Sequence, residues 1–223
     1  MRKRDKDIVQ AVEKFRCLTR DQIAAMFYSH TKNPTTNCNY ALKRLRDRGY
    51  IAADTNRTPY VYFPSQSKLK KDGQKVEHFL KIADFYLDLL RNGWKIRQFD
   101  IEPRYEGADV RPDIFTIANG SPFFVEIQNS VYSTQVMAKK IKLYERFYDS
   151  GYWRSFDWQP ADRAIFPFVW IVGENTYKVT SDRFRIVQSK DVADLMRQVK
   201  PKRPAYEPVK QSMYSGQIKI NIG

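Results

Sequence analysis

Apolar residues recur at helical spacing in three stretches of the first fifty residues. Residues 7–15 carry apolar side chains at i, i+3, i+4 and i+7, the pattern of an amphipathic helix. A second helix is expected after Thr19, because Thr19 and Gln22 have the Thr-x-x-Gln spacing of a capping box and an apolar run to Phe27 follows. Residues 35–48 predict a third helix with one apolar face, and Gly49 is placed to end it.

Two short strand-like segments follow the third expected helix. Residues 50–53 and 60–63 contain aromatic and β-branched side chains and flank the polar Asn56-Arg57-Thr58-Pro59 turn, which predicts a β-hairpin. Three helices followed by a hairpin are typical of a winged helix-turn-helix. We therefore expect residues 1–70 to form a DNA-binding domain of this kind.

Polar and basic side chains occupy the face of the third expected helix opposite its apolar one. In a winged helix-turn-helix this helix enters the major groove, where polar side chains meet base edges and basic ones meet phosphates. Asparagine amides can pair with adenine, and lysine and arginine supply phosphate affinity. The candidate DNA-binding residues are Thr35, Thr36, Asn37, Asn39, Tyr40, Lys43, Arg44 and, in the turn, Arg57. The alternative is a protein-interaction module whose basic face is merely solvated.

The C-terminal two thirds alternate between helical and strand-like patterns after a polar linker at residues 68–74. Helices are expected over residues 76–90, 134–148 and 190–199, and strands over residues 94–101, 112–117, 122–128 and 164–172. The order is α-β-β-β-α-β-α. The pattern predicts a chain of the α+β or α/β class, with a second domain over residues 75–200 and a basic tail over residues 201–223.

Two carboxylates stand at matching ends of adjacent expected strands. Arg111-Pro112-Asp113 opens one strand, and Glu126-Ile127-Gln128 ends the next. Paired carboxylates suit Mg²⁺ in phosphodiester chemistry, because this hard cation takes oxygen ligands and keeps positions open for water and phosphate. The residues and the order of elements resemble the PD-(D/E)xK restriction-endonuclease-like core, which implies Asp113 and Glu126 as metal ligands. Gln128 stands where active members carry a lysine, so it can position water but supplies no positive charge.

The next expected helix offers a replacement cation, since Lys139, Lys140 and Lys142 crowd one turn. By helical angle Lys140 lies nearest the apolar face and is the best placed of the three to reach the carboxylates, but an ordinary solvated basic face is the favoured interpretation of this run. The candidate catalytic residues are Asp113, Glu126, Gln128, Lys140 and, from the first helix of the domain, Glu77.

Other carboxylates on that first helix stay open as alternatives to Glu77, namely Asp84 and Asp88. His78 follows Glu77 directly. Its expected role is that of a packed or surface helix residue rather than a base.

The net charge of the chain favours a polyanionic partner, and the distribution of charge indicates which part of the chain would bind it. The chain carries 39 Lys and Arg against 25 Asp and Glu, a net charge of +14. Residues 1–72 hold 16 basic and 7 acidic side chains, residues 73–199 hold 18 and 17, and residues 200–223 hold 5 and 1. The basic surface is therefore expected in the first third of the chain, with a contribution from the tail.

The cysteines and the hydropathy of the chain bear on its cellular location, on zinc binding and on membrane association. Cys17 and Cys38 both fall at apolar positions of helix-like patterns, which favours reduced core thiols and a cytoplasmic protein. The two cysteines and two histidines are too scattered to predict a zinc site. The longest apolar run, residues 164–172, is too short to span a bilayer, so no membrane partner is expected.

Several stretches together resemble the replication-relaxation proteins of plasmids, phages and integrative elements. They are residues 15–24 (FRCLTRDQIA), residues 42–51 (LKRLRDRGYI), Glu77-His78, Arg111-Pro112-Asp113, residues 124–128 (FVEIQ) and the helix around residues 140–144. The resemblance implies a double-stranded-DNA-binding accessory protein of a mobile element, concerned with replication, mobilisation or regulation. It also implies a degenerate or weakly active nuclease-like domain, and partners among the replication, mobilisation or regulatory proteins of the same element.

Two other functions remain open on the sequence. One is an endonuclease that cuts with Asp113 and Glu126 while the winged helix targets it, and only this function would need Mg²⁺ as a cofactor. The other is a transcriptional repressor that forms a homodimer through its C-terminal domain.

Overall fold

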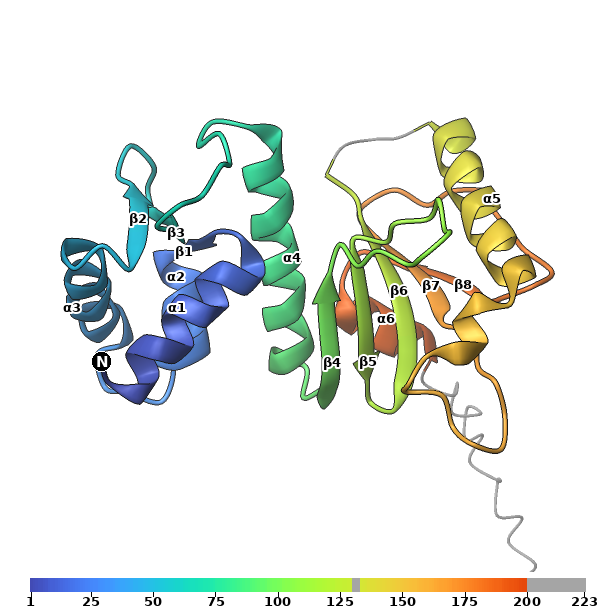
Figure 1. Ribbon diagram of the computed structural model, residues 1–223, viewed down its shortest axis with the longest axis horizontal. Coiled ribbons are helices and arrows are strands. Elements are labelled where there is room, and N and C mark those ends of the chain that lie inside the picture. Colours follow the sequence, from blue (N-terminus) through green and yellow to red (C-terminus); the bar gives the residue numbers. More distant parts are fainter. Residues whose placement is uncertain (130–132, 200–223) are drawn as a thin grey trace, which may run out of the picture.

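The chain combines helices with two β-sheets. The computed structural model describes residues 1–129 and 133–199. In Figure 1 a small helical unit with a three-stranded sheet lies on one side of the long helix α4, and a five-stranded sheet with two further helices lies on the other. The expected mixed class of α and β structure is confirmed at this level.

The N-terminal unit contains three helices and three short strands. The helices are α1 (Lys3–Phe15), α2 (Arg20–Phe27) and α3 (Pro34–Asp47), and the strands are β1 (Leu18–Thr19), β2 (Ile51–Asp54) and β3 (Val61–Pro64). The strands form an antiparallel sheet in the order β1-β3-β2. The predicted capping box is present, since Thr19 Oγ1 accepts from the Gln22 amide and Gln22 Oε1 accepts from the Thr19 amide.

The rest of the described chain surrounds the larger sheet. Its helices are α4 (Gln74–Arg91), α5 (Thr134–Ser150), α6 (Val192–Val199) and the 3₁₀ turn η1 (Tyr152–Ser155), and its strands are β4 (Ile96–Ile101), β5 (Ile114–Ala118), β6 (Ser121–Ile127), β7 (Phe168–Val172) and β8 (Ile186–Ser189). The strand order is β4-β5-β6-β7-β8, antiparallel from β4 to β6 and parallel from β6 to β8.

Successive side chains of β6 point to opposite faces of this sheet. Val125 and Ile127 belong to the apolar core formed with α4 and α6, whereas Phe124 packs into a second core with α5. Glu126 has the same parity as Phe124. Its carboxylate therefore points to the α5 side of the sheet.

Helix α4 connects the N-terminal unit to the large sheet. Tyr86 stacks edge-on against Phe15 of α1, and Phe85 stacks edge-on against Trp170 of β7, with ring centroids 5.3 and 5.1 Å apart. The side-chain amide of Gln22 donates through Nε2 to the Leu80 carbonyl at 2.9 Å. Buried residues on both sides of α4 form one continuous apolar core.

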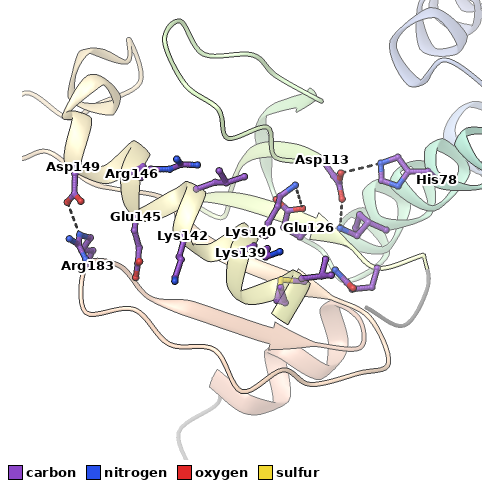
Figure 2. A pocket seen from close by; sticks show the side chains of 15 residues that line it. His78, Asp113, Glu126, Lys139, Lys140, Lys142, Glu145, Arg146, Asp149 and Arg183 are labelled. Carbon is purple, nitrogen blue, oxygen red and sulfur yellow. Dashed lines mark hydrogen bonds and ion pairs between the residues drawn. The ribbon is translucent and has the colours of Figure 1, made fainter. Parts of the chain in front are cut away.

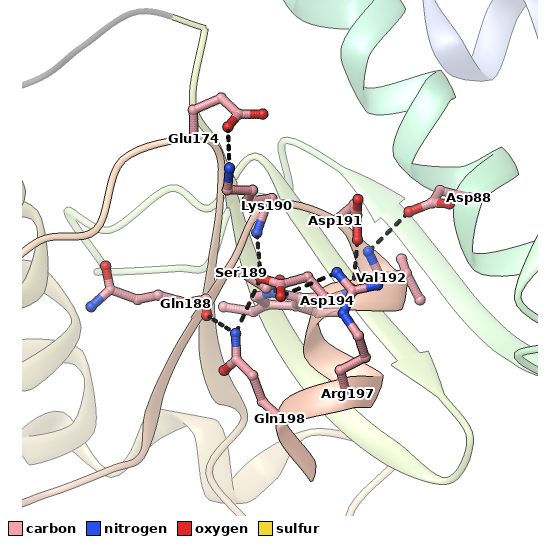
Figure 3. A network of polar contacts seen from close by, with 11 residues as sticks. Asp88, Glu174, Gln188, Ser189, Lys190, Asp191, Val192, Asp194, Arg197 and Gln198 are labelled. Atoms are coloured by element: carbon pink, nitrogen blue, oxygen red, sulfur yellow. Dashed lines mark hydrogen bonds and ion pairs between the residues drawn. The ribbon is translucent and has the colours of Figure 1, made fainter. Parts of the chain in front are cut away.

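Carboxylates cap the start of α6 and link it to α4. Asp88 Oδ2 accepts from the Val192 amide at 2.9 Å, Asp191 Oδ1 accepts from the Asp194 amide at 2.6 Å, and Asp194 Oδ2 accepts from the Lys190 amide at 3.1 Å (Figure 3). Such caps satisfy the free amides of a helix start. The Asp88 carboxylate thus links α4 to the start of α6.

All the predicted helices and strands are present, with shifted ends. Strand β7 begins at Phe168, four residues later than expected, and β1, β8 and η1 were not predicted. Cys17 and Cys38 are buried free thiols, as predicted. Among the described residues no helix is long and apolar enough to cross a membrane. The basic tail expected over residues 201–223 lies outside the described residues.

Candidate functional site

The two predicted carboxylates meet at one end of the large sheet. Asp113 directly precedes β5, and β5 pairs with β6 so that Ile114 lies opposite Val125. The antiparallel register therefore carries Asp113 to the level of Glu126. Figure 2 shows both side chains beside the cavity that α5 covers, as the sequence predicts.

Asp113 is held from two sides. Its Oδ2 accepts from the Ile127 amide at 2.7 Å, and its Oδ1 lies 3.3 Å from Nε2 of His78 on α4. Burial lowers the pKa of His78, but the contact with Asp113 and the charges of Asp113, Glu102 and Glu126 outweigh burial and raise it. The pair thus favours a protonated imidazole next to the carboxylate.

Glu126 is a buried acid with two donors. Glu126 is only 4% exposed. Tyr144 donates to its Oε1 at 2.5 Å, and Lys140 Nζ lies 2.9 Å from its Oε2. Burial and the nearby charge of Asp113 raise the pKa of Glu126 to about 7, although Lys140 and Tyr144 act to lower it. Glu126 can therefore exchange a proton near neutral pH.

Lys140 brings the positive charge to this pair. Besides its contact with Glu126, its Nζ donates to the Arg111 carbonyl at 3.0 Å. The ammonium group therefore bridges the loop before β5 and the end of β6. Lys140 thus turns inward from α5, so the favoured interpretation of the lysine run as a solvated face is wrong for this residue.

Gln128, at the position of the motif lysine, is fixed beside the same cavity. Its Oε1 accepts from the Tyr177 hydroxyl at 2.9 Å, and its backbone amide donates to the Val172 carbonyl at 2.9 Å. Gly173 leaves room for it, since a Cβ at that position would lie 2.6 Å from the Gln128 Cβ. Gln128 is a positioned amide without charge.

The cavity at these residues measures about 900 Å³, and charged side chains of both signs line it. From α5 and the segment before β8 come the cations Lys139, Lys142, Arg146 and Arg183 and the acids Glu145 and Asp149 (Figure 2). Arg183 pairs with Asp149 at 2.7 Å, and Arg146 lies 3.5 Å from Asp109. These four cations outnumber the two acids beside them, which suits an anionic ligand.

The structure does not bring Glu77 to the carboxylate pair. Glu77 accepts from Arg57 of the β2–β3 loop, and the alternative Asp84 accepts from Gln22 at 2.7 Å. Asp88, the other alternative, caps α6. His78 is the residue that α4 contributes.

Helical spacing relates His78 to the sheet only once the packing of α4 is known. His78 and Phe85 are seven residues apart and share a face of α4, and Phe85 packs on the sheet. Glu77 instead shares its face with Asp84, which contacts α2. Tyr144, a buried residue of α5, was not among the candidate residues, and it contributes its hydroxyl to Glu126.

The polar face of α3 is exposed along its length. Thr35, Thr36, Asn37, Asn39, Tyr40 and Lys43 are all exposed, Tyr40 by 67%, while Cys38, Ala41, Leu42 and Leu45 are buried. Two predicted phosphate contacts have partners within the protein instead. Arg44 Nη2 lies 2.7 and 2.9 Å from the two oxygens of buried Asp5, and Arg57 contacts Glu77 and lies 3.5 Å from Asp54.

The donor chemistry at the carboxylate pair fits a hard divalent cation. Asp113 and Glu126 offer oxygen ligands of the kind Mg²⁺ takes, although each carboxylate oxygen already has a protein partner: the Ile127 amide and His78 for Asp113, and Tyr144 and Lys140 for Glu126. Within residues 1–129 and 133–199, no group of three or more His, Cys, Asp or Glu side chains is arranged to hold a metal ion. Any metal held here would thus depend on two protein carboxylates and on ligands from solvent or substrate.

No protein-family model matches the chain, and no curated protein is similar to it in sequence.

Proposed function

We propose that the protein binds double-stranded DNA, with its N-terminal unit acting as a winged helix-turn-helix whose α3 enters the major groove. The exposed polar face of α3 carries this proposal. Its side chains are hydrogen-bonding and basic, they project from a helix whose opposite face is firmly buried, and the surrounding 72 residues hold the excess of positive charge. The resemblance to replication-relaxation proteins extends the proposal to the DNA of a mobile element.

Binding of fluorescent duplexes by the full chain tests this proposal. The variant Thr36→Ala/Asn39→Ala/Lys43→Ala alters only exposed residues of α3, and Asn175→Ala/Thr176→Ala/Lys178→Ala removes the same three side-chain types from an exposed loop before β8. Removing a few base and phosphate contacts should weaken binding by at least about 10-fold in the α3 variant. The loop variant should bind like the wild type. Equal affinity of both variants, or no duplex binding by the wild type, would refute the proposal.

A second function is favoured by the position of Lys140. We propose that the cavity hydrolyses phosphodiesters, because Lys140 supplies beside Glu126 the positive charge that Gln128 lacks. In hydrolysis a water oxygen bonds to phosphorus, one ester P–O bond breaks, and the water proton ends on the released oxygen. Mg²⁺ held by Asp113 and Glu126 would polarise the phosphate and lower the pKa of water.

Nicking of supercoiled plasmid with Mg²⁺ or Mn²⁺ tests this second function. Asp113→Ala and Lys140→Ala should abolish nicking, whereas Lys75→Ala, which alters an exposed lysine of α4 that does not line this cavity, should retain it. Nicking that survives Asp113→Ala would come from another site or a contaminant. Equal effects of the two lysine variants would exclude a special role for Lys140.

A further inference from the structure

The N-terminus of the chain lies beside α3 (Figure 1). A second cavity is lined there by residues of both segments. It measures about 640 Å³, and we call it the N-terminal hollow. Arg2, Arg4 and Asp5 line it from the start of the chain, Tyr28 from the end of α2, and Asn37 and Tyr40 from α3. None of the basic residues at the start of the chain was among the candidate DNA-binding residues.

Among the described residues, one acid lines the hollow, and it is already neutralised. Asp5 is 4% exposed, and both of its carboxylate oxygens lie within 2.9 Å of Arg44 Nη2. This ion pair removes one negative and one positive charge from the balance. Arg2 and Arg4 remain as the net charge of the hollow, so it attracts anions.

The Arg4 side chain has a defined place at the wall. Its guanidinium carbon lies 4.8 Å from the centre of the Tyr28 ring, a cation–π contact, and its Nη2 lies 3.4 Å from His30 Nε2. A guanidinium whose orientation is already restricted loses less entropy when it binds a phosphate. Arg4 is therefore suited to a fixed anion contact.

The hollow is continuous with the face of α3 that we propose to contact bases. Asn37 and Tyr40 belong to that face and also line the hollow. A helix in the major groove has the sugar-phosphate backbones along its two sides. Resting on the proposed DNA-binding function, we infer that the N-terminal hollow holds backbone phosphates of the bound duplex through Arg2 and Arg4.

Phosphate contacts make affinity depend on salt but not on base sequence. The slope of log affinity against log salt changes by about 0.9 for each phosphate that the protein no longer neutralises. Arg2→Gln/Arg4→Gln should therefore reduce the slope by about 1 to 2 and weaken binding on the order of 10-fold at about 0.1 M salt. The reduction should be the same on unrelated duplexes.

Duplex binding by the full chain across a salt series measures these slopes. Arg154→Gln/Arg163→Gln, which removes two exposed arginines from the segment between α5 and β7, is the matched control and should keep the wild-type slope. An unchanged slope in Arg2→Gln/Arg4→Gln, or a reduction in affinity that varies with duplex sequence, overturns the inference while the wild type still binds. Failure of the wild type to bind any duplex would instead remove the proposed function, and this inference with it.

Discussion

Replacing Glu126 by glutamine should change how the stability of the protein depends on pH. Burial and the charge of Asp113 raise the pKa of Glu126 from its ordinary value of 4.5 to about 7. Between these pH values the folded protein keeps a proton that the unfolded chain has released. The free energy of unfolding therefore falls as pH rises from about 4.5 to 7, and the stabilisation is complete only below the unfolded pKa.

The size of this fall follows from the two pKa values. Each pKa unit corresponds to about 1.4 kcal/mol, so the rise from 4.5 to about 7 makes Glu126 responsible for a loss of roughly 3 kcal/mol. The raised pKa of His78 acts in the same direction, because a raised histidine pKa also stabilises the folded state at low pH. Glu126→Gln should retain only the smaller contribution of His78.

Urea denaturation at pH 5, 6, 7 and 8 in the presence of a chelator measures the effect. The free energy of unfolding of the wild type should fall across this range, whereas that of Glu126→Gln should change much less with pH. The slope of the unfolding free energy against urea concentration should be the same in both proteins. Glu106→Gln, which alters an exposed carboxylate, should follow the wild type. Parallel profiles for Glu126→Gln and the wild type would show that Glu126 does not titrate as a buried acid, and the electrostatic reasoning would fail.

Three further substitutions separate structural roles from proposed functional ones. Gly173→Ala should lower the free energy of unfolding by about 1–3 kcal/mol in urea denaturation, because its Cβ would lie 2.6 Å from the Gln128 Cβ; stability equal to the wild type would show that this contact relaxes freely. Arg44→Gln should lower it by roughly 2 kcal/mol because buried Asp5 loses its ion-pair partner, whereas Lys43→Gln should change it by less than about 0.5 kcal/mol and weaken DNA binding. Equal stability of these two variants in the same measurement would contradict the assignment of Arg44 as a structural residue.

The sequence predicted those parts of the site that local geometry determines. Asp113 and Glu126 are joined through the β5–β6 hairpin, whose turn residues Asn119 and Gly120 have φ angles of 48° and 77°. An Asn-Gly pair favours this left-handed turn and sets the pairing register of the two strands. The meeting of the two carboxylates was therefore encoded within about fifteen residues of chain.

The contribution of α4 could not be predicted in this way. Glu77 and His78 differ by one position, or about 100° of helical rotation. Which of them faces Asp113 depends on how α4 sits between two units, with Phe85 against Trp170 on one side and Tyr86 against Phe15 on the other. These contacts are distant in sequence, and no local pattern specifies them.

Strand β8 escaped prediction for a similar reason. It has only four residues, and Ile186, Val187 and Gln188 are all half-buried, so it lacks the alternation of a strand with one buried face. Its pairing with β7, across a segment of thirteen residues, defines it as an edge strand. The interaction that forms the strand is again tertiary.

Ion pairing within the protein reduces the number of N-terminal cations that can contact DNA phosphates. The sequence counts Arg44 and Arg57 toward the positive charge of residues 1–72, but in the structure they neutralise Asp5 and Glu77. A charge that is paired within the protein contributes little to the salt dependence of binding, because it displaces few counterions from a phosphate. The cations left to meet a duplex are then those at the exposed edges, on α3 and at the start of the chain. The measured salt slope should accordingly be smaller than the 16 basic side chains of residues 1–72 suggest.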